Sequence, residues 1–198
     1  MIHPIVHPKI LTNLAKLIRA LCEPPMITVY LMAIFYMTGL LTALDQITVV
    51  LALLVVLPLA SYLLADFIPQ VRRRGPEGKR RIAFYVYPIG YILAVLYALL
   101  FSVKTITFKL LLTYLISAIF LVIFNKVLHI RASGHTCGTV GPYLMATFSL
   151  GLGYGFWLGI AVVIVIWASL YLGRHTVQEI IWGAVCSILG FLIAFVLL

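Results

Sequence analysis

The sequence has few charged residues and very few acidic ones. Of its 198 residues, 10% are charged and 64% are hydrophobic, and 14 basic residues stand against five acidic ones. Soluble domains carry about 25% charged residues, so this composition excludes an ordinary soluble globular protein. It predicts a chain that lies mostly in a lipid bilayer, organised as one domain.

The chain also lacks the cysteine patterns of disulfide-rich and zinc-binding proteins. Its three cysteines, Cys22, Cys137 and Cys186, are odd in number, widely spaced and mostly surrounded by apolar residues. A disulfide framework or a zinc ribbon needs closer, paired spacing. The sequence therefore predicts neither.

We do not expect residues 1–25 to be a cleaved signal peptide, because Cys22-Glu23-Pro24-Pro25 stands where a small-residue cleavage site would be found. Apolar residues recur there at helical spacing, at Ile10, Leu14, Leu17, Ile18 and Leu21. Lys9, Asn13 and Lys16 fall on another face. This pattern predicts an amphipathic helix on the membrane surface, ended by the two prolines. A plain cytoplasmic lead-in explains the segment about as well.

Residues 26–198 are expected to form a single all-α domain, a polytopic transmembrane helical bundle of about six to seven spans. Apolar runs bounded by charged or turn residues give the spans. We expect them at 26–44, 47–65, 83–101, 108–128, 137–150, 156–172 and 176–197. The fifth and sixth are shorter than the ~20 residues of a full crossing. Turns are expected at Asp45-Gln46, at Lys104-Thr105 and at Gly151 to Gly155, and residues 66–82 form the one long polar connection.

The basic residues are distributed unevenly over these segments. With seven spans, the N-terminus, residues 66–82 and the segments around residues 131–135 and 173–175 fall on one side of the membrane. All basic residues except Lys104 and Lys109 belong to that side. The positive-inside rule then predicts a multi-pass protein of the cell membrane with these segments at the cytoplasmic face. Such cations suit anionic lipid headgroups better than nucleic acid, which we do not expect as a partner.

Two short polar stretches carry the residues suited to chemistry, Arg131 to Thr136 and Gly173 to Thr176. Each contains a histidine beside cations, and phosphoryl transfer needs cationic donors, an in-line nucleophile and an acid for the leaving oxygen. Histidine suits the last two tasks because its pKa lies near neutrality. Glu179 follows His175 by four residues, on the same helical face and inside an apolar run, where a carboxylate can orient the imidazole.

The two stretches resemble motifs of the type 2 phosphatidic acid phosphatase superfamily of membrane lipid phosphatases. Residues 131–135, Arg-Ala-Ser-Gly-His, resemble its Pro-Ser-Gly-His motif. Residues 167–183 resemble its last motif, Ser-Arg, five residues, His, three residues, Asp, and the His-Thr pair with Gly183 is similar to isoprenoid and dolichyl diphosphatases. The resemblance implies that His175 is the nucleophile, forming a phosphohistidine, that Glu179 supports it, and that His135 is the general acid. It also implies that Ser133 and Gly134 cradle the phosphate, without a metal or other cofactor.

The sequence departs from that pattern in its cations. The first motif, Lys, six residues, Arg-Pro, is not present in that form, and Ser169 stands where the last motif has its Arg. We expect Lys126, Arg131 and Arg174 to supply the phosphate-binding cations. Additional candidates are Arg73, Arg74 and Ser169. A metal site is conceivable from ligand types, at His135, Cys137, His175 and Glu179, but the surrounding cations favour an anion.

These features predict an integral membrane lipid phosphatase. Its substrate is expected to be a phosphate or diphosphate monoester of an isoprenoid or glycerolipid, hydrolysed at the membrane interface. The alternative is a weakened or inactive member that binds or translocates a phosphorylated lipid, which the replaced Arg at position 169 favours. An unrelated transporter is a third interpretation, but the inverted-repeat hydropathy that would favour it is not seen.

Overall fold

The computed structural model describes residues 8–198, apart from the side chains of residues 76, 77, 80 and 83. Residues 1–7 of the predicted N-terminal segment lie outside this range. The described chain forms helices and no strand, in agreement with the predicted all-α class. The helices in chain order are α1 (Lys9–Leu21), α2 (Pro24–Met37), α3 (Leu44–Leu51), η1 (Ala52–Val56), α4 (Leu57–Leu64), η2 (Ala65–Phe67), α5 (Pro69–Arg72), α6 (Gly75–Leu100), α7 (Thr105–Val122), η3 (Ile123–Val127), α8 (Gly134–Leu150), α9 (Leu152–Tyr171) and α10 (Val177–Leu197).

Each of the seven predicted apolar segments is helical, but fewer of them meet the length and hydropathy of a membrane crossing. Four described helices do so, at Leu44–Phe67, Thr105–Val127, Leu152–Tyr171 and Val177–Leu197. A fifth is reached if α1 and α2, which meet at a 60° bend, count as one span. The apolar part of α6, Phe84–Leu100, is shorter. Four to five apolar helices long enough to cross a bilayer are thus present, against the six to seven expected.

Three expected connections differ from the observed ones. The turn expected at Asp45 lies earlier, after Met37, and Asp45 is in the first turn of α3. The polar connection 66–82 is mostly helical, because Gly75 turns the chain with φ +57° and Pro76 then suits the first turn of α6. Gly151 alone makes the turn between α8 and α9, with φ +92°. Gly153 and Gly155 lie inside α9, which has 20 residues and so exceeds the expected length.

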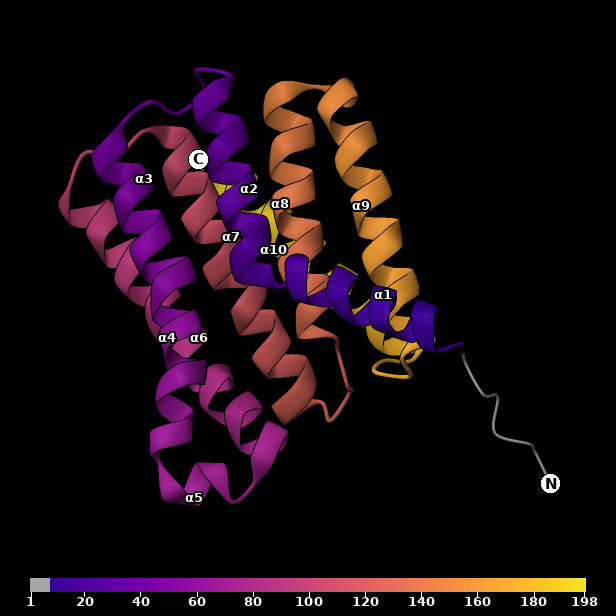
Figure 1. Cartoon of the computed structure of the whole chain (residues 1–198). Coiled ribbons are helices and arrows are strands. Elements are labelled where there is room, and N and C mark those ends of the chain that lie inside the picture. The colour runs from indigo at the N-terminus through magenta and orange to yellow at the C-terminus, as the bar shows by residue number, and fades with distance from the viewer. Residues whose placement is uncertain (1–7) are drawn as a thin grey trace.

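The helices stand side by side around an apolar core, and α1 crosses in front of them (Figure 1). Phe35, Leu54, Leu110, Met145 and Phe191 contribute core side chains from α2, η1, α7, α8 and α10. α10 packs along both α7 and α8, and α9 packs on α8. Burial of these apolar side chains between helices positions the two stretches that carry the histidines.

Those two stretches lie at the same end of the bundle. The α7–α8 and α9–α10 connections and α5 are at the lower end in Figure 1, whereas the α2–α3, α6–α7 and α8–α9 connections are at the upper end. α1 lies toward the lower end and packs against α9, and its Ala15 is buried. The bundle therefore gathers both histidine segments and α1 in one region.

Candidate functional site

The turn between α9 and α10 positions His175 and Glu179. Gly173, with φ +61°, lets the chain leave α9, and the Thr176 hydroxyl caps α10 by accepting a hydrogen bond from the Glu179 N–H (3.2 Å). The side chain of Glu179 is then directed back to His175, whose Nδ1 lies 2.8 Å from Oε2. An ionised carboxylate accepts hydrogen bonds and does not donate them, so Nδ1 carries the proton and Nε2 presents its lone pair.

Glu179 also connects α10 to the segment before α8. Its second oxygen, Oε1, lies 3.2 Å from a guanidinium nitrogen of Arg131, and its backbone carbonyl accepts the Ser133 N–H (2.8 Å). Gly183 permits this approach, because a Cβ at that position would overlap the Ser133 carbonyl group. The absence of a side chain at Gly183 thus lets the two histidine segments come together.

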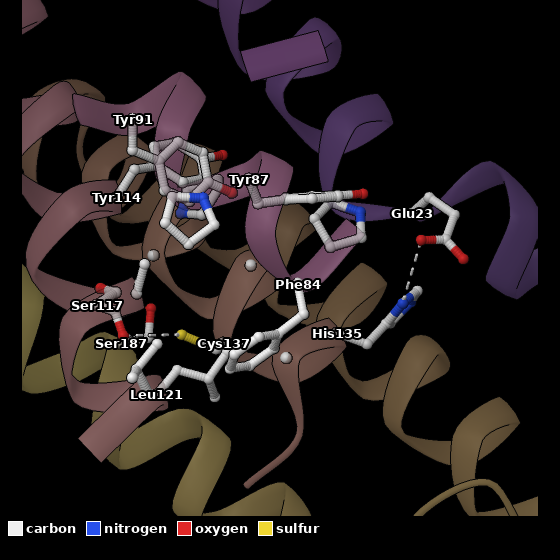
Figure 2. A pocket seen from close by; sticks show the side chains of 18 of the residues that line it. Glu23, Phe84, Tyr87, Tyr91, Tyr114, Ser117, Leu121, His135, Cys137 and Ser187 are labelled. Atoms are coloured by element: carbon white, nitrogen blue, oxygen red, sulfur yellow. Dashed lines mark hydrogen bonds and ion pairs between the residues drawn. The ribbon is translucent and has the colours of Figure 1, made fainter. Parts of the chain in front are cut away.

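His135 lies in the first turn of α8, which Ser133 caps by accepting the Thr136 N–H (3.2 Å). The His135 side chain is buried, with 8% of the residue exposed. Its Nδ1 lies 3.8 Å from the carboxylate of Glu23, at the α1–α2 corner (Figure 2). Within residues 8–198, its buried Nε2 has no hydrogen-bond partner. A buried polar atom without a partner is costly, so this nitrogen is suited to meet a ligand.

Burial and positive neighbours keep both histidines neutral. Burial, followed by the charges of Arg19 and His175, lowers the pKa of His135 to about 3. Burial also lowers the pKa of His175, against the hydrogen bond to Glu179, which raises it. Arg19 and Arg131 contribute to the lowering at His175. A neutral His175 has the lone pair that a nucleophile needs.

Both histidines border a cavity of about 490 Å³ that runs from this end into the bundle. That volume lies within the ~300–1,000 Å³ typical of small-molecule sites. Four cationic residues line it: Arg19, Lys79, Arg131 and Arg174. Deeper in, the labelled wall residues in Figure 2 are aromatic, hydroxyl- or thiol-bearing, and in one case aliphatic: Phe84, Tyr87, Tyr91, Tyr114, Ser117, Cys137, Ser187 and Leu121. The cavity thus joins a cationic mouth to an amphipathic interior.

The predicted site residues are only partly brought together. Residues that line the cavity are His135, His175, Gly134, Arg131 and Arg174, with Glu179 held behind His175. Ser133 is fully buried as the cap of α8 and is not among the lining residues.

The other predicted cations lie outside the cavity. Lys126 lies over the ring of Phe84, 5.2 Å from its centroid. Arg73 and Arg74 are exposed between α5 and α6. Lys79, from the same basic segment, does line the cavity and pairs with Asp66 at 2.6 Å.

Two lining residues, Arg19 and Glu23, were missed by the sequence reasoning. Arg19 donates a hydrogen bond to the hydroxyl of Ser169 (2.5 Å), a residue of α9 that is 1% exposed. Glu23 approaches His135 as described above. One sequence signal was available: Glu23 is the sole acid before Asp45, and it directly precedes two prolines.

Among the described residues, no three His, Cys, Asp or Glu side chains are grouped so that they could hold a metal ion. The donors that do converge on the cavity are guanidinium, ammonium and imidazole groups, which suit an anion. Comparison of the chain with protein-family models, with curated proteins and with solved structures found no match.

Proposed function

We propose that the protein is an integral membrane phosphatase that hydrolyses a phosphate or diphosphate monoester of a lipid. The observation that carries the proposal is a pair of histidines at one cavity, each with a carboxylate near Nδ1. Nε2 of each is thereby left for a substrate. Guanidinium and ammonium groups at the mouth suit the charge of a phosphate group.

The proposal places seven helical segments across the membrane, with the histidines at the cytoplasmic face. Support comes from the shorter apolar part of α6 and from α8, which stand beside the four longer apolar helices. α1 is proposed to lie in the interface, because Ile10, Leu14, Leu17 and Leu21 are exposed on it. The site would then open where lipid headgroups meet water.

In the proposed reaction, Nε2 of His175 attacks phosphorus in line with the lipid oxygen. The N–P bond forms as the P–O bond to the lipid breaks, and Nε2–H of His135 gives its proton to the leaving oxygen. Water then attacks the phosphohistidine, His135 takes a proton from that water, and inorganic phosphate leaves as the N–P bond breaks. Atoms and charges balance without a further reactant.

His135 must be protonated to act as this acid, whereas burial and Arg19 favour its neutral form in the empty site. A bound phosphate ester offsets the charge of Arg19 and favours protonated His135. Glu23, 3.8 Å from Nδ1, contributes in the same direction. The general acid thus forms when substrate binds, and the empty site holds His135 in its neutral form.

The second candidate is a protein that binds or moves a phosphorylated lipid without hydrolysing it. The low pKa of His135 favours this candidate, because a permanently neutral imidazole could bind a phosphate edge but could not protonate a leaving group. The two candidates share the cavity and differ only in turnover.

Phosphate release separates them. The protein in detergent is incubated with phosphatidate, phosphatidylglycerophosphate, polyprenyl phosphate and polyprenyl diphosphate. We expect release from at least one, abolished in His175→Ala and retained in His129→Ala, which changes an exposed histidine outside the cavity. Release that is equal in His175→Ala, or absent for every substrate, would overturn the phosphatase. Saturable binding without release would support the second candidate.

A further inference from the structure

Arg19 reaches the site from α1, outside the two histidine stretches. Its guanidinium donates to Ser169 Oγ (2.5 Å), and the same hydroxyl donates to the backbone carbonyl of Val165 (2.8 Å). Because Ser169 is buried in α9, this contact fixes the guanidinium against the bundle rather than in free solvent. The side chain lines the same cavity as His135 and His175.

The other two guanidinium groups of the cavity are more exposed than that of Arg19. The Arg131 side chain is 78% exposed and pairs with Glu179. Arg174 is also exposed. Arg19 is partly buried, and its charge acts on both histidines, lowering the pKa of each. Of these three arginines, Arg19 is therefore the partly buried one, and its charge acts on both imidazoles.

We propose that Arg19 binds the phosphate group of the substrate, and that the α1–α2 corner therefore forms part of the substrate-binding site. This inference rests on the proposed function, since it assigns the anion that occupies the cavity mouth. A guanidinium carries five N–H donors in a rigid fork, and Ser169 accepts a hydrogen bond from one of its terminal nitrogens. Ser169 thus sets the orientation of a group that can donate to non-bridging phosphate oxygens.

The structure also explains how a residue near the N-terminus is held in place. The corner packs against α8 at Gly138, where a Cβ would lie 2.6 Å from the Pro24 ring. Glu23 lies beside His135, and Tyr30 donates to the Leu21 carbonyl (3.1 Å) across the corner. These contacts fix the end of α1 relative to α8, and the bond from Arg19 to Ser169 fixes it relative to α9.

This placement gives a reason for the serine at position 169. An arginine there would bring a second guanidinium into the buried space beside Arg19, where like charges repel. A serine instead accepts a hydrogen bond from the arginine that another helix supplies. α1 thus supplies the cation, and α9 supplies the hydroxyl group that orients it.

The test moves the guanidinium between the two helices. Arg19→Ala, Arg19→Lys, Ser169→Arg and the double variant Arg19→Ala/Ser169→Arg are compared with Lys16→Ala, an exposed cation on the same helix. Two quantities are measured in detergent: kcat/KM on the best substrate, and the inorganic phosphate concentration that gives half-maximal thermal stabilisation.

For Arg19→Ala we expect a fall in kcat/KM of roughly 100-fold or more and a rise in the half-maximal phosphate concentration of roughly 10-fold. Both quantities for Arg19→Lys should lie between those of wild type and Arg19→Ala, because an ammonium group lacks the planar set of donors of a guanidinium. Ser169→Arg alone should lose activity, the double variant should regain roughly 10-fold over Arg19→Ala, and Lys16→Ala should stay within about twofold.

The inference would be overturned if Arg19→Ala bound phosphate as tightly as wild type. It would also be overturned if Lys16→Ala weakened phosphate binding as much as Arg19→Ala does. A folded double variant no better than Arg19→Ala would overturn it as well, since it would show that a guanidinium at that place does nothing. The phosphate measurement needs no turnover, so it tests Arg19 even if wild type releases no phosphate. An active wild type matched by Arg19→Ala would remove the inference and leave the proposed function standing.

Discussion

In the proposed reaction, Glu179 prepares His175 to act as the nucleophile. The carboxylate holds Nδ1 at 2.8 Å and thereby selects the tautomer with a free Nε2. The same carboxylate contacts Arg131 at 3.2 Å, so its negative charge is shared between an imidazole and a guanidinium. Loss of Glu179 would therefore change both the orientation of the ring and the pKa of its nitrogen.

The pH dependence of activity tests this arrangement. The pKa of His175 lies below 6.5 because burial outweighs the hydrogen bond to Glu179. Only neutral His175 can attack, and bound substrate favours protonated His135, so kcat should fall in acid with its midpoint below pH 6.5. Glu179→Gln removes the interaction that raises the pKa, so the midpoint should move to lower pH. The maximum of kcat should drop by roughly 100-fold or more, because an amide can hold the wrong tautomer.

The profiles are measured from about pH 4.5 to about pH 8, on either side of the ordinary histidine pKa. His129→Ala serves as the control, since that exposed histidine lies outside the cavity. A wild-type midpoint above pH 6.5, or a midpoint that rises in Glu179→Gln, would contradict the role given to the pair.

Gly183 is the second residue whose identity the site depends on. A methyl group there overlaps the Ser133 carbonyl group, so Gly183→Ala must push α10 away from the start of α8. The bond from Ser133 N–H to the Glu179 carbonyl (2.8 Å) would be lost first. We expect destabilisation by about 1–3 kcal/mol, as for other overpacked sites, together with loss of phosphate release.

The matched control is Gly153→Ala in α9, where an added Cβ has no neighbour within 4 Å. Alanine is favoured over glycine in a helix by about 0.5–1 kcal/mol, so this variant should be slightly more stable and fully active. Thermal unfolding in detergent and phosphate release are measured for both. Equal effects of the two substitutions would show that the Gly183 contact is unimportant.

At the scale of elements, the structure gives different surroundings to two cations before α8 that the sequence alone does not distinguish. Arg131 lines the cavity and contacts Glu179, whereas Lys126 in η3 lies over the Phe84 ring. Arg131→Ala should lower kcat/KM by roughly 10-fold or more, since it removes a charge at the cavity mouth. Lys126→Ala should stay within about twofold. A larger loss in Lys126→Ala than in Arg131→Ala would reverse this assignment of the cations.

The elements that sequence reasoning finds are those whose signals are local. Long apolar runs give the helices, because helical periodicity is local. The four-residue spacing of His175 and Glu179 indicates their contact, but His175 precedes α10, so the contact depends on the turn and on the Thr176 cap rather than on a shared helical face. Residues 66–82 are misread as a loop because arginines, glycines and prolines are typical of loops. Here Gly75 turns the chain and Pro76 fits the first turn of α6.

Arg19 and Glu23 could not be placed in the same way. The contact from Arg19 to Ser169 joins residues 150 positions apart. It depends on the 60° bend between α1 and α2 and on the close packing of Pro24 against Gly138. An amphipathic pattern predicts that α1 is a helix, but it does not predict against which part of the bundle the end of that helix packs. The sequence therefore yields the two histidines and Glu179, and the fold adds the residues of the α1–α2 corner.

At the scale of the whole molecule, the end that carries the site also carries most of the positive charge. α5, the start of α6 and both histidine connections lie at that end, and the α6–α7 connection, which contains Lys104, lies at the other. If the positive-inside rule holds, this end is cytoplasmic and α6 crosses the membrane, although only Phe84–Leu100 of it is strongly apolar. Sidedness and the crossing of α6 can be measured together.

Single cysteines are introduced by Arg73→Cys before α6 and by Ser102→Cys after it, both at exposed positions. The background carries Cys22→Ser, because Cys22 is partly exposed while Cys137 and Cys186 are buried. With a membrane-impermeant maleimide on intact cells, Ser102→Cys should be labelled, and Arg73→Cys only after permeabilisation. The reverse pattern would put the histidines outside. Labelling of both from one side would mean that α6 does not cross, because an odd number of crossings must separate positions on opposite faces.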